Sequence, residues 1–444
     1  MTRALALVDG EHYPSTTRWA LATAAAEGFD VVACLFVGGV EKLGADRALD
    51  LGVPVDLVGD DLAAGVAGAL DRHRPDAVLD LSDEPILGES ERAVVAAVTL
   101  AEGVRYLGPD FALDPPIRAD RLSVPALAVI GTGKRTGKTA LAGEAARVAA
   151  NLGLDPVVVA MGRGGPPGPQ VVEAGSMNLD GLLDLARSGR HAASDYLEDA
   201  LTTGVTTIGA RRAGGGLFGG PYVSNVVEAA RLAEDRAPGL VILEGSGAAV
   251  PPVPWDAGVL VAPAGGPGGA LGASLGASYR VLLSDLVVFR IGDGPDVGPP
   301  DLSDRISHVR RLRPGARTVV VELTPVPLGE VRGKKVFFAT TAPPSAGPRL
   351  ITALESFGAE VVGSTHRLGD RAGLTEDLEA APAFEALVTE LKAAAVDVAA
   401  ERALAREAEV VICDNRPNTV DGDGDIDDLL ADTARAAVDR NTER

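Results

Sequence analysis

The feature that most constrains the fold is a glycine-rich turn between an apolar run and a helical pattern. Residues 126–131 form the apolar run, and Thr132–Thr139 read TGKRTGKT before the helical pattern starts. Glycines let successive backbone N–H groups point at one anion, and the N-terminus of the following helix adds its dipole. The last lysine of such a turn reaches the β- and γ-phosphates, and the next hydroxyl binds Mg²⁺. We therefore expect a P-loop that binds ATP and Mg²⁺. The residues expected at the nucleotide are Gly131, Gly133, Thr136, Gly137, Lys138, Thr139 and Ala140, with Thr139 also at the metal.

The rest of the chain has the rhythm of an α/β protein. Short apolar runs alternate with longer helical patterns, as in βα units. Aromatic residues make up 4% of the chain, so Val, Leu, Ala and Ile must form the core, which favours buried parallel sheets. Because 444 residues exceed what one core normally serves, several domains are expected.

We predict three segments within this α/β fold. Residues 1–122 form a Rossmann-like domain, although its first βα turn lacks the G-x-G-x-x-G fingerprint of dinucleotide binding. Residues 123–330 form a P-loop NTPase domain with a central parallel sheet. Residues 331–444 form an α/β segment that is either a separate domain or completes the P-loop domain. Within it, the pattern of Ala386–Glu407 predicts a long helix.

Charge and cysteine content limit the possible partners and location. The formal net charge is −21 and the pI is near 4.7, which disfavours binding to nucleic acid or to an anionic membrane surface. Cys34 and Cys413 sit in apolar runs and read as buried thiols rather than a disulfide framework. The N-terminus does not resemble a signal peptide, and no run approaches the ~18–20 apolar residues of a membrane span. We expect a cytoplasmic protein.

A second group of cations suggests that the site holds an acceptor as well as a nucleotide. Two of these residues lie inside the glycine-rich turn, one follows the next strand, and two precede another glycine-rich run. Arginine binds phosphate and carboxylate groups through two hydrogen bonds at once, so an acceptor with several negative charges is expected. These residues are Lys134, Arg135, Arg163, Arg211 and Arg212. Each could instead be a solvated surface charge.

The loop also resembles that of the dethiobiotin synthetases, in which glycine, five residues and then Gly-Lys-Thr follow one another. The segment Ile242–Val253, ILEGSGAAVPPV, is similar to their strand that ends in Glu-Gly-Ala-Gly. The resemblance implies that Glu244 helps to hold Mg²⁺. The residues alone indicate the same, because a carboxylate at the carboxyl end of a neighbouring parallel strand faces the phosphate crevice.

Over nearly its full length the chain resembles the cyclic 2,3-diphosphoglycerate synthetases. The resemblance rests on six segments taken together. They are LVDGEHYP (Leu7–Pro14), GTGKRTGKT (Gly131–Thr139), AMGRGGPPGP (Ala160–Pro169), the segment ending at Val253, LVTELKAAAVDVA (Leu387–Ala399) and VICDNRPNTV (Val411–Val420).

The resemblance implies an ATP-dependent ligase that closes 2,3-diphosphoglycerate into its cyclic anhydride and releases ADP and phosphate. It also associates the family with phosphorylation of 2-phosphoglycerate, and it suggests a homodimer. We expect Lys138, Lys134, Arg135 and Arg163 to be catalytic. The expected acceptor ligands are Asp9, Glu11, His12, Arg163, Arg211 and Arg212.

Three other functions remain open from the sequence. A P-loop kinase or synthetase could act on a different phosphorylated or carboxylated molecule. Residues Phe337–Arg371 faintly resemble the lipid-modifying tetraacyldisaccharide 4′-kinases, but we find no amphipathic membrane element. A regulatory GTPase would carry Asn-Lys-x-Asp, which is missing, and a non-catalytic module would not need Lys138, Thr139 and Glu244 together.

Overall fold

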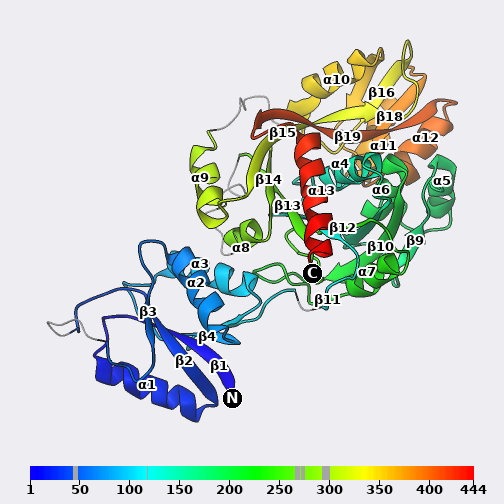
Figure 1. Ribbon diagram of the computed structural model, residues 1–444. Helices are drawn as coiled ribbons and strands as arrows, with labels where there is room; N and C mark the ends of the chain where they lie inside the picture. Colours follow the sequence, from blue (N-terminus) through cyan, green and yellow to red (C-terminus); the bar gives the residue numbers. More distant parts are fainter. Residues whose placement is uncertain (44–48, 118, 266–270, 272–275, 293–300) are drawn as a thin grey trace.

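Two β-sheets organise the chain, one formed before residue 114 and the other after residue 125 (Figure 1). The computed structural model describes residues 1–43, 49–117, 119–265, 271, 276–292 and 301–444. The first sheet has the order β3-β2-β1-β4-β5-β6, and every neighbouring pair is parallel except the last. Its strands are β1 (Thr2–Val8), β2 (Phe29–Phe36), β3 (Val55–Leu57), β4 (Ala77–Asp80), β5 (Arg105–Leu107) and β6 (Ala112–Leu113). Its helices are α1 (Pro14–Ala26), α2 (Leu62–His73) and α3 (Glu89–Ala101).

The face of the first sheet that α2 and α3 cover is also where this sheet contacts the rest of the protein. Helices α2 and α3 pack against β1 and β4, and α3 contacts α8 (Ala277–Leu282), as Figure 1 shows. Phe218 and Tyr279 enter this core from the later part of the chain, with their rings edge to face at 5.7 Å. The hydrophobic core of the N-terminal sheet is therefore completed by residues that the P-loop segment supplies.

The second sheet has thirteen strands, twelve of them in the order β11-β10-β8-β12-β7-β13-β14-β15-β19-β18-β16-β17, and β9 pairs with β10. Its first eight strands are β7 (Ala126–Gly131), β8 (Pro156–Gly162), β9 (Gln170–Val172), β10 (Thr206–Ala213), β11 (Val223–Ser224), β12 (Leu240–Glu244), β13 (Ala257–Pro263) and β14 (Leu286–Arg290). The others are β15 (Arg317–Pro327), β16 (Lys335–Ala339), β17 (Glu360–Thr365), β18 (Ala386–Glu390) and β19 (Glu409–Gly422). Strands β10, β8, β12, β7, β13, β14 and β15 form a continuous parallel block.

The centre of the parallel block is buried on both faces because its strands are mainly apolar. In β7, alternate residues point to opposite sides, so Leu127 and Val129 pack with α4 (Lys138–Asn151) and α13 (Ile426–Thr442). Ala128 and Ile130 pack on the other side with α7 (Val226–Glu234) and α9 (Ser303–Leu312). The predicted α/β class with a central parallel sheet is confirmed. The remaining helices are α5 (Leu179–Arg187), α6 (Asp195–Thr203), α10 (Gly347–Ser356), α11 (Arg371–Ala380), α12 (Glu401–Leu404), a 3₁₀ turn at Pro344–Ala346 and a π-helix at Ala395–Ala400.

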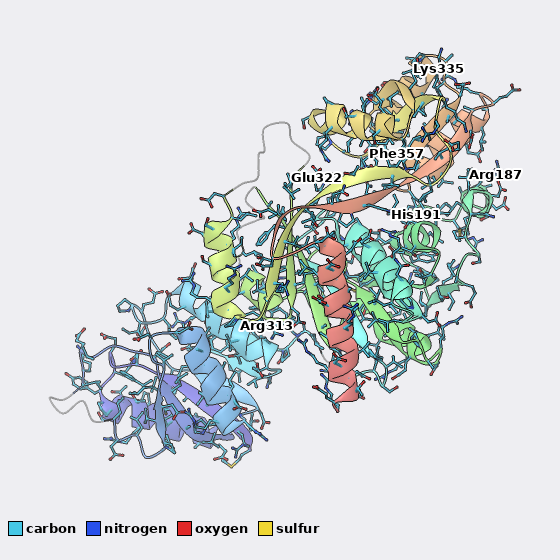
Figure 2. The ribbon with its side chains drawn as sticks, turned by 45° about the horizontal axis from the view of Figure 1, so that its top comes forward. Arg187, His191, Arg313, Glu322, Lys335 and Phe357 are labelled. Atoms are coloured by element: carbon cyan, nitrogen blue, oxygen red, sulfur yellow. The ribbon has the colours of Figure 1, made fainter. Side chains whose placement is uncertain are left out.

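A long antiparallel ribbon carries the C-terminal strands. Strands β15 and β19 pair from Val319 with Gly422 to Pro327 with Cys413, and the chain between them forms β16, β17 and β18 beyond the ribbon. Figure 2 shows the two strands running side by side away from the central sheet, with Glu322 on β15. These strands thus hydrogen-bond into the same sheet as the P-loop strands. The domain boundaries at residues 122 and 330 stay a prediction, because continuous strand pairing does not by itself define a domain.

One predicted element is wrong in type. We expected a long helix over Ala386–Glu407, but Ala386–Glu390 forms β18, which is buried between β16 and β19. Only the residues after Ala394 are helical, as the π-helix and α12. A short apolar run reads the same in a buried strand and in a buried helix, so its neighbours in the sheet decide. Among the described residues, no helix combines the length and apolar composition needed to cross a bilayer.

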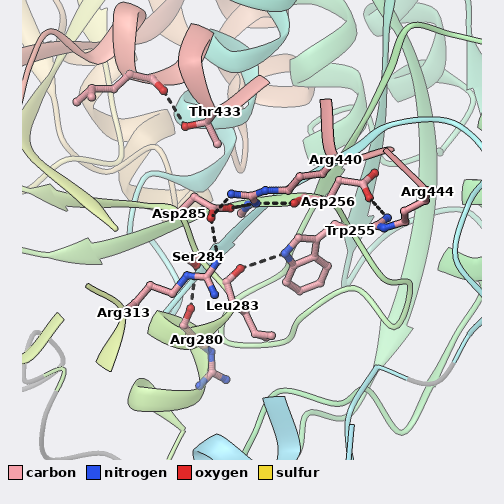
Figure 3. A network of polar contacts seen from close by, with 12 residues as sticks. Trp255, Asp256, Arg280, Leu283, Ser284, Asp285, Arg313, Thr433, Arg440 and Arg444 are labelled. Carbon is pink, nitrogen blue, oxygen red and sulfur yellow. Dashed lines mark hydrogen bonds and ion pairs between the residues drawn. The ribbon is translucent and has the colours of Figure 1, made fainter. Parts of the chain in front are cut away.

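Helix α13 is fixed to the amino-terminal ends of the central strands by a network of half-exposed arginines and more deeply buried carboxylates (Figure 3). Arg440 donates to both oxygens of Asp285 at 2.9 and 3.0 Å and to the backbone oxygen of Asp256 at 2.7 Å. Arg313 adds a bond of 2.8 Å to Asp285. Burial alone would raise the pKa of Asp285, but these bonds outweigh it and hold the pKa below its usual value. The last helix therefore depends on an ionised Asp285.

We predict that Asp285→Asn lowers the stability of the fold at pH 7 by roughly 2–3 kcal/mol, because it leaves two arginines without their anion. This is below the value for a fully buried pair, since Arg313 and Arg440 are each 39% exposed. A carboxylate with a lowered folded-state pKa stabilises the fold above its unfolded pKa of about 4, so the difference should shrink as the pH falls below that value.

Denaturant midpoints followed by the fluorescence of Trp255, which bonds to Leu283 in the same network, would measure this difference. Asp432→Asn is the control, because this aspartate lies on α13 with its side chain 61% exposed. Equal midpoints for wild type and Asp285→Asn at pH 7 would contradict the prediction.

Candidate functional site

The turn after β7 has the geometry expected of a phosphate-binding loop. Strand β7 ends at Gly131 and α4 begins at Lys138, so the helix N-terminus points into the loop. A Cβ built on Gly131 would lie 2.8 Å from the Thr136 hydroxyl and 2.9 Å from Cδ of Lys138, which explains why glycine is needed there. The Lys138 Nζ donates to the Gly133 carbonyl at 2.7 Å and to Thr136 Oγ1 at 3.2 Å.

Lys138 lies deep in the site, with 6% of its surface exposed. Burial lowers its pKa to about 8, and Glu244 and Asp195 act in the opposite direction. The charges of Arg163 and Arg212 lower it further, which means that both arginines lie near this lysine. Lys138 is thus surrounded by groups of both signs.

Glu244 meets Thr139 at the end of the neighbouring strand. Strand β12 lies between β7 and β8, and its last residue accepts a hydrogen bond of 2.7 Å from Thr139 Oγ1 through Oε1. The carboxylate is 2% exposed, and its Oε2 has no hydrogen-bond partner within the described chain. Burial and then the charge of Asp195 raise the pKa of Glu244 to about 7, against the opposing effects of Thr139 and Lys138.

This pair suits a divalent cation. A hydroxyl and a carboxylate oxygen are the hard ligands that Mg²⁺ prefers, and the unpartnered Oε2 is a buried acceptor that a hydrated ion would satisfy. Among the described residues, no three His, Cys, Asp or Glu side chains lie close enough to form a metal cage of their own. Mg²⁺ typically takes one or two carboxylates and completes its shell with water and nucleotide phosphates, so the residues present fit it.

Two arginines converge on the turn that follows Glu244. Gly247 adopts φ +60°, and a Cβ built on it would lie 2.5 Å from Nη2 of Arg163 and 3.2 Å from Nη2 of Arg212. Arg212 donates to the backbone oxygens of Ser246 at 2.7 Å and Gly214 at 2.6 Å. Its pKa is lowered, first by burial and then by Arg163. Within the described chain neither arginine pairs with a carboxylate, so their charge is free to meet an anion.

A cavity of about 540 Å³ contains this arrangement. One side is formed by Lys134 and Arg135 of the P-loop together with Arg163, which follows β8. A second side is formed by Asp195, the first residue of α6, and by His191, which Figure 2 labels. The opposite wall comes from the C-terminal strands. It includes Thr340, Thr341, Glu390, Lys392, Cys413 and Asn415.

The predicted site residues do not all meet. The cavity lining includes Lys134, Arg135, Thr136, Gly137, Lys138, Thr139, Ala140, Arg163 and Glu244, while Gly131 and Gly133 lie in the same loop. Arg212 lies beside Arg163 over Gly247 rather than in the lining. Arg211 is exposed, and its backbone N–H donates to Asn225. A substrate role for Arg211 stays a prediction.

The structure does not bring Asp9, Glu11 and His12 to the P-loop cavity. They follow β1 in the first sheet, and none of them lines the cavity described above. Asp9 accepts bonds from the backbone of Glu11, His12 and Asp83 and lies 2.8 Å from the His12 ring, which explains its burial as part of a turn. Figures 1 and 2 show the reason, because the P-loop faces the C-terminal strands while the first sheet joins through α8. A substrate role for these residues remains a prediction.

The sequence did not single out the charged pair on the opposite wall. Glu390 ends β18 and accepts bonds from Thr340 Oγ1 at 2.7 Å and Thr341 Oγ1 at 2.9 Å, and Lys392 lies 3.2 Å away. Burial alone would raise the pKa of Glu390, but Lys392 and these bonds bring it to about 2. A carboxylate at the end of a strand would have indicated a site residue, but Ala386–Glu390 was predicted as part of a helix rather than as a strand.

Comparisons with known proteins agree on one family. A family model for the P-loop domain of cyclic 2,3-diphosphoglycerate synthetase matches residues 126–322. The models for the N-terminal and C-terminal domains of the same enzyme match residues 3–114 and 327–416.

Three similar proteins all carry the name cyclic 2,3-diphosphoglycerate synthetase. The one from Rubrobacter xylanophilus is 44% identical over 439 residues and covers 98% of both chains. The one from Methanothermobacter thermautotrophicus is 40% identical over 448 residues, which are 98% of this chain and 96% of that one. The one from Thermococcus kodakarensis is 40% identical over 425 residues, which are 94% and 95% of the two chains.

We predict that Gly131→Ala weakens the binding of ADP by roughly tenfold to a hundredfold, because overpacking the loop costs about 1–3 kcal/mol. Isothermal titration calorimetry would measure the dissociation constant. Gly315→Ala is the control, since a Cβ at this position between α9 and β15 meets no atom within 4 Å. Unchanged ADP affinity in Gly131→Ala would show that the loop does not need this close approach.

Proposed function

The chain belongs to the cyclic 2,3-diphosphoglycerate synthetase family, and from this premise we propose that it is an ATP-dependent ligase that closes 2,3-diphosphoglycerate into its cyclic phosphoanhydride. The matched segments extend from residue 3 to residue 416 and include every motif on which the resemblance rested except the last residues of the final one.

The observation that carries the proposal is the convergence of cations on the P-loop cavity. Arg163 and Arg212 both lower the pKa of Lys138, and Arg163 also lowers that of Arg212, while neither arginine has a carboxylate partner among the described residues. Holding like charges together is unfavourable unless an anion neutralises them. A nucleotide phosphate chain and an acceptor with two phosphates would supply that negative charge, in a protein whose net charge is −21.

The reaction conserves atoms in two displacements. In the first, an oxygen of one acceptor phosphate bonds to the γ-phosphorus of ATP, the bond from that phosphorus to the β–γ bridging oxygen breaks, and ADP leaves. In the second, an oxygen of the neighbouring phosphate bonds to the activated phosphorus, and inorganic phosphate leaves. The products are the cyclic anhydride, ADP and phosphate.

The roles proposed for this chain's residues follow from positioning and charge neutralisation. Lys138 would hold the β- and γ-phosphates, with Lys134 and Arg135 at the edge of the same loop. Arg163 and Arg212 would hold the acceptor's two phosphates together against their mutual repulsion, so that ring closure becomes a favourable intramolecular step. The position of both guanidiniums over Gly247, beside Glu244, supports this assignment.

Mg²⁺ would be held by Thr139 and Glu244, and when bound it would neutralise charge on the nucleotide phosphates. The 2.7 Å bond between these residues and the unpartnered oxygen of Glu244 support this placement. Phosphorylation of 2-phosphoglycerate, a cytoplasmic location and a homodimer belong to the same proposal. All three are supported by the family resemblance. The free, buried thiols of Cys34 and Cys413 support the cytoplasmic location as well, because they suit a reducing compartment.

Release of ADP from ATP and Mg²⁺ should be stimulated by 2,3-diphosphoglycerate, and ³¹P NMR should then detect a new anhydride signal. The assay uses 2-phosphoglycerate and 3-phosphoglycerate as the other acceptors, and Lys138→Ala as the inactive control. If ADP appears while 2,3-diphosphoglycerate is unchanged, the ligase proposal is wrong and the chain is a P-loop kinase or synthetase for a different phosphorylated or carboxylated molecule.

Gly247→Ala should raise the KM for 2,3-diphosphoglycerate by roughly tenfold or more, because the added Cβ displaces Arg163 and a bond to a charged group contributes about 1.5–3 kcal/mol. ADP affinity should stay within about twofold, since the P-loop is untouched. Gly175→Ala is the matched control, because Gly175 also has a positive φ, +67°, and its Cβ meets no atom within 4 Å. An unchanged KM, or an equal loss of ADP affinity, would count against the acceptor role of Arg163.

A further inference from the structure

Asp199 is a buried acidic side chain to which no described N–H group or hydroxyl donates a hydrogen bond. It lies on α6 and is 1% exposed, and neither Oδ1 nor Oδ2 has a hydrogen-bond partner within the described chain. Buried carboxylates are normally paired or hydrogen-bonded, because desolvation of an unpartnered charge is costly. Two such oxygen atoms in one side chain therefore call for a ligand.

The unpartnered oxygens face Glu244. The charge of Glu244 is the largest electrostatic influence on Asp199, and the two carboxyl groups lie within hydrogen-bonding reach of each other. Oε2 of Glu244 is also unpartnered, so three buried oxygens gather beside Thr139. Burial, followed by the charges of Glu244, Glu198 and Asp195, raises the pKa of Asp199 well above its usual value.

The nearby cations do not cancel this negative charge. Lys138 acts on Glu244, but its Nζ donates to the Gly133 carbonyl. Arg147, on α4, feels the charge of Asp199, yet its guanidinium already contacts Glu144 at 2.8 Å and Asp414 at 2.9 Å. Among the described residues, no cation forms an ion pair with Asp199 or Glu244.

We propose that Asp199 is a positioning residue for the divalent cation, and that its carboxylate accepts hydrogen bonds from water molecules bound to the ion that Thr139 and Glu244 would hold. The inference rests on the metal assignment in the proposed function. Mg²⁺ keeps several waters, and carboxylates behind the direct ligands orient them. Thr139 and Glu244 line the cavity and Asp199 does not, so Asp199 acts through water rather than as a direct ligand.

The structure offers a reason for placing this carboxylate on α6. Helix α6 packs against both α4 and β8, and its first residue, Asp195, lines the cavity one turn before Asp199. Helix α6 would therefore place two acidic residues near the ion, with Asp195 in the cavity lining and Asp199 in the interior of the protein.

The test compares Asp199→Asn with wild type by titrating Mn²⁺ into the protein–ADP complex and following electron paramagnetic resonance. Asparagine keeps the size of the side chain and removes the charge, so Mn²⁺ affinity should fall by about 10- to 100-fold. ADP affinity in EDTA should stay within about twofold, and the melting temperature without metal should be equal or higher, because the repulsion between buried acidic side chains has been reduced. Asp184→Asn, an exposed carboxylate on α5, should leave all three values unchanged.

Unchanged Mn²⁺ affinity in Asp199→Asn would overturn the proposal, as would a lower melting temperature without metal combined with normal Mn²⁺ affinity, which is the result of a purely structural role. If Asp199→Asn does not fold, Asp199→Ser provides the same comparison with a smaller neutral side chain. No diphosphoglycerate is present in these measurements. A wrong acceptor in the proposed function would therefore leave their outcome unaffected.

Discussion

The site depends on keeping positive and negative charge apart within one largely buried volume. Arg163 and Arg212 gather positive charge over the turn after β12, while Glu244 and Asp199 gather negative charge beside the start of α4. Lys138 lies between these groups and is influenced by both. Like charges that are held close together repel one another, so the arrangement is complementary to a ligand that carries an anion and a cation side by side. A metal–nucleotide complex has this character, and the strand ends of the parallel block bring its contacts together.

The second constraint is the β15–β19 ribbon, which determines what faces the P-loop. Because β19 pairs with β18, the ribbon brings the carboxyl end of β18 to the far side of the cavity. Glu390 and Lys392 then form a rigid, hydrogen-bonded wall opposite the arginines. The cavity is therefore shaped by one segment that holds the phosphates and another that limits the size and charge of the molecule between them.

Local patterns in the sequence were enough to predict the fold class, the P-loop and the meeting of Thr139 with Glu244. Each of these depends on spacing within one βα unit or on the adjacency of parallel strand ends, which short motifs specify. The opposite wall could not be predicted, because whether Ala386–Glu390 is a strand depends on partners far away in the chain. The place of Asp9 relative to the P-loop could not be predicted for a related reason, since a motif locates a strand end but not the direction in which its sheet faces. Asp199 lies in an ordinary amphipathic helix, and only its burial without partners sets it apart.

The position of α13 has a consequence for how the protein is made. This helix, Ile426–Thr442, packs against α4 and the central strands β7 and β13. The core around the P-loop therefore contains residues that are far apart in the order of synthesis. The ribosome must therefore translate the whole C-terminal insertion between β15 and β19 before the apolar face of α4 can be covered. Until Thr442 has been added, the nascent chain carries a P-loop whose supporting helix is exposed on one side, and it would be a substrate for chaperones rather than a working nucleotide site.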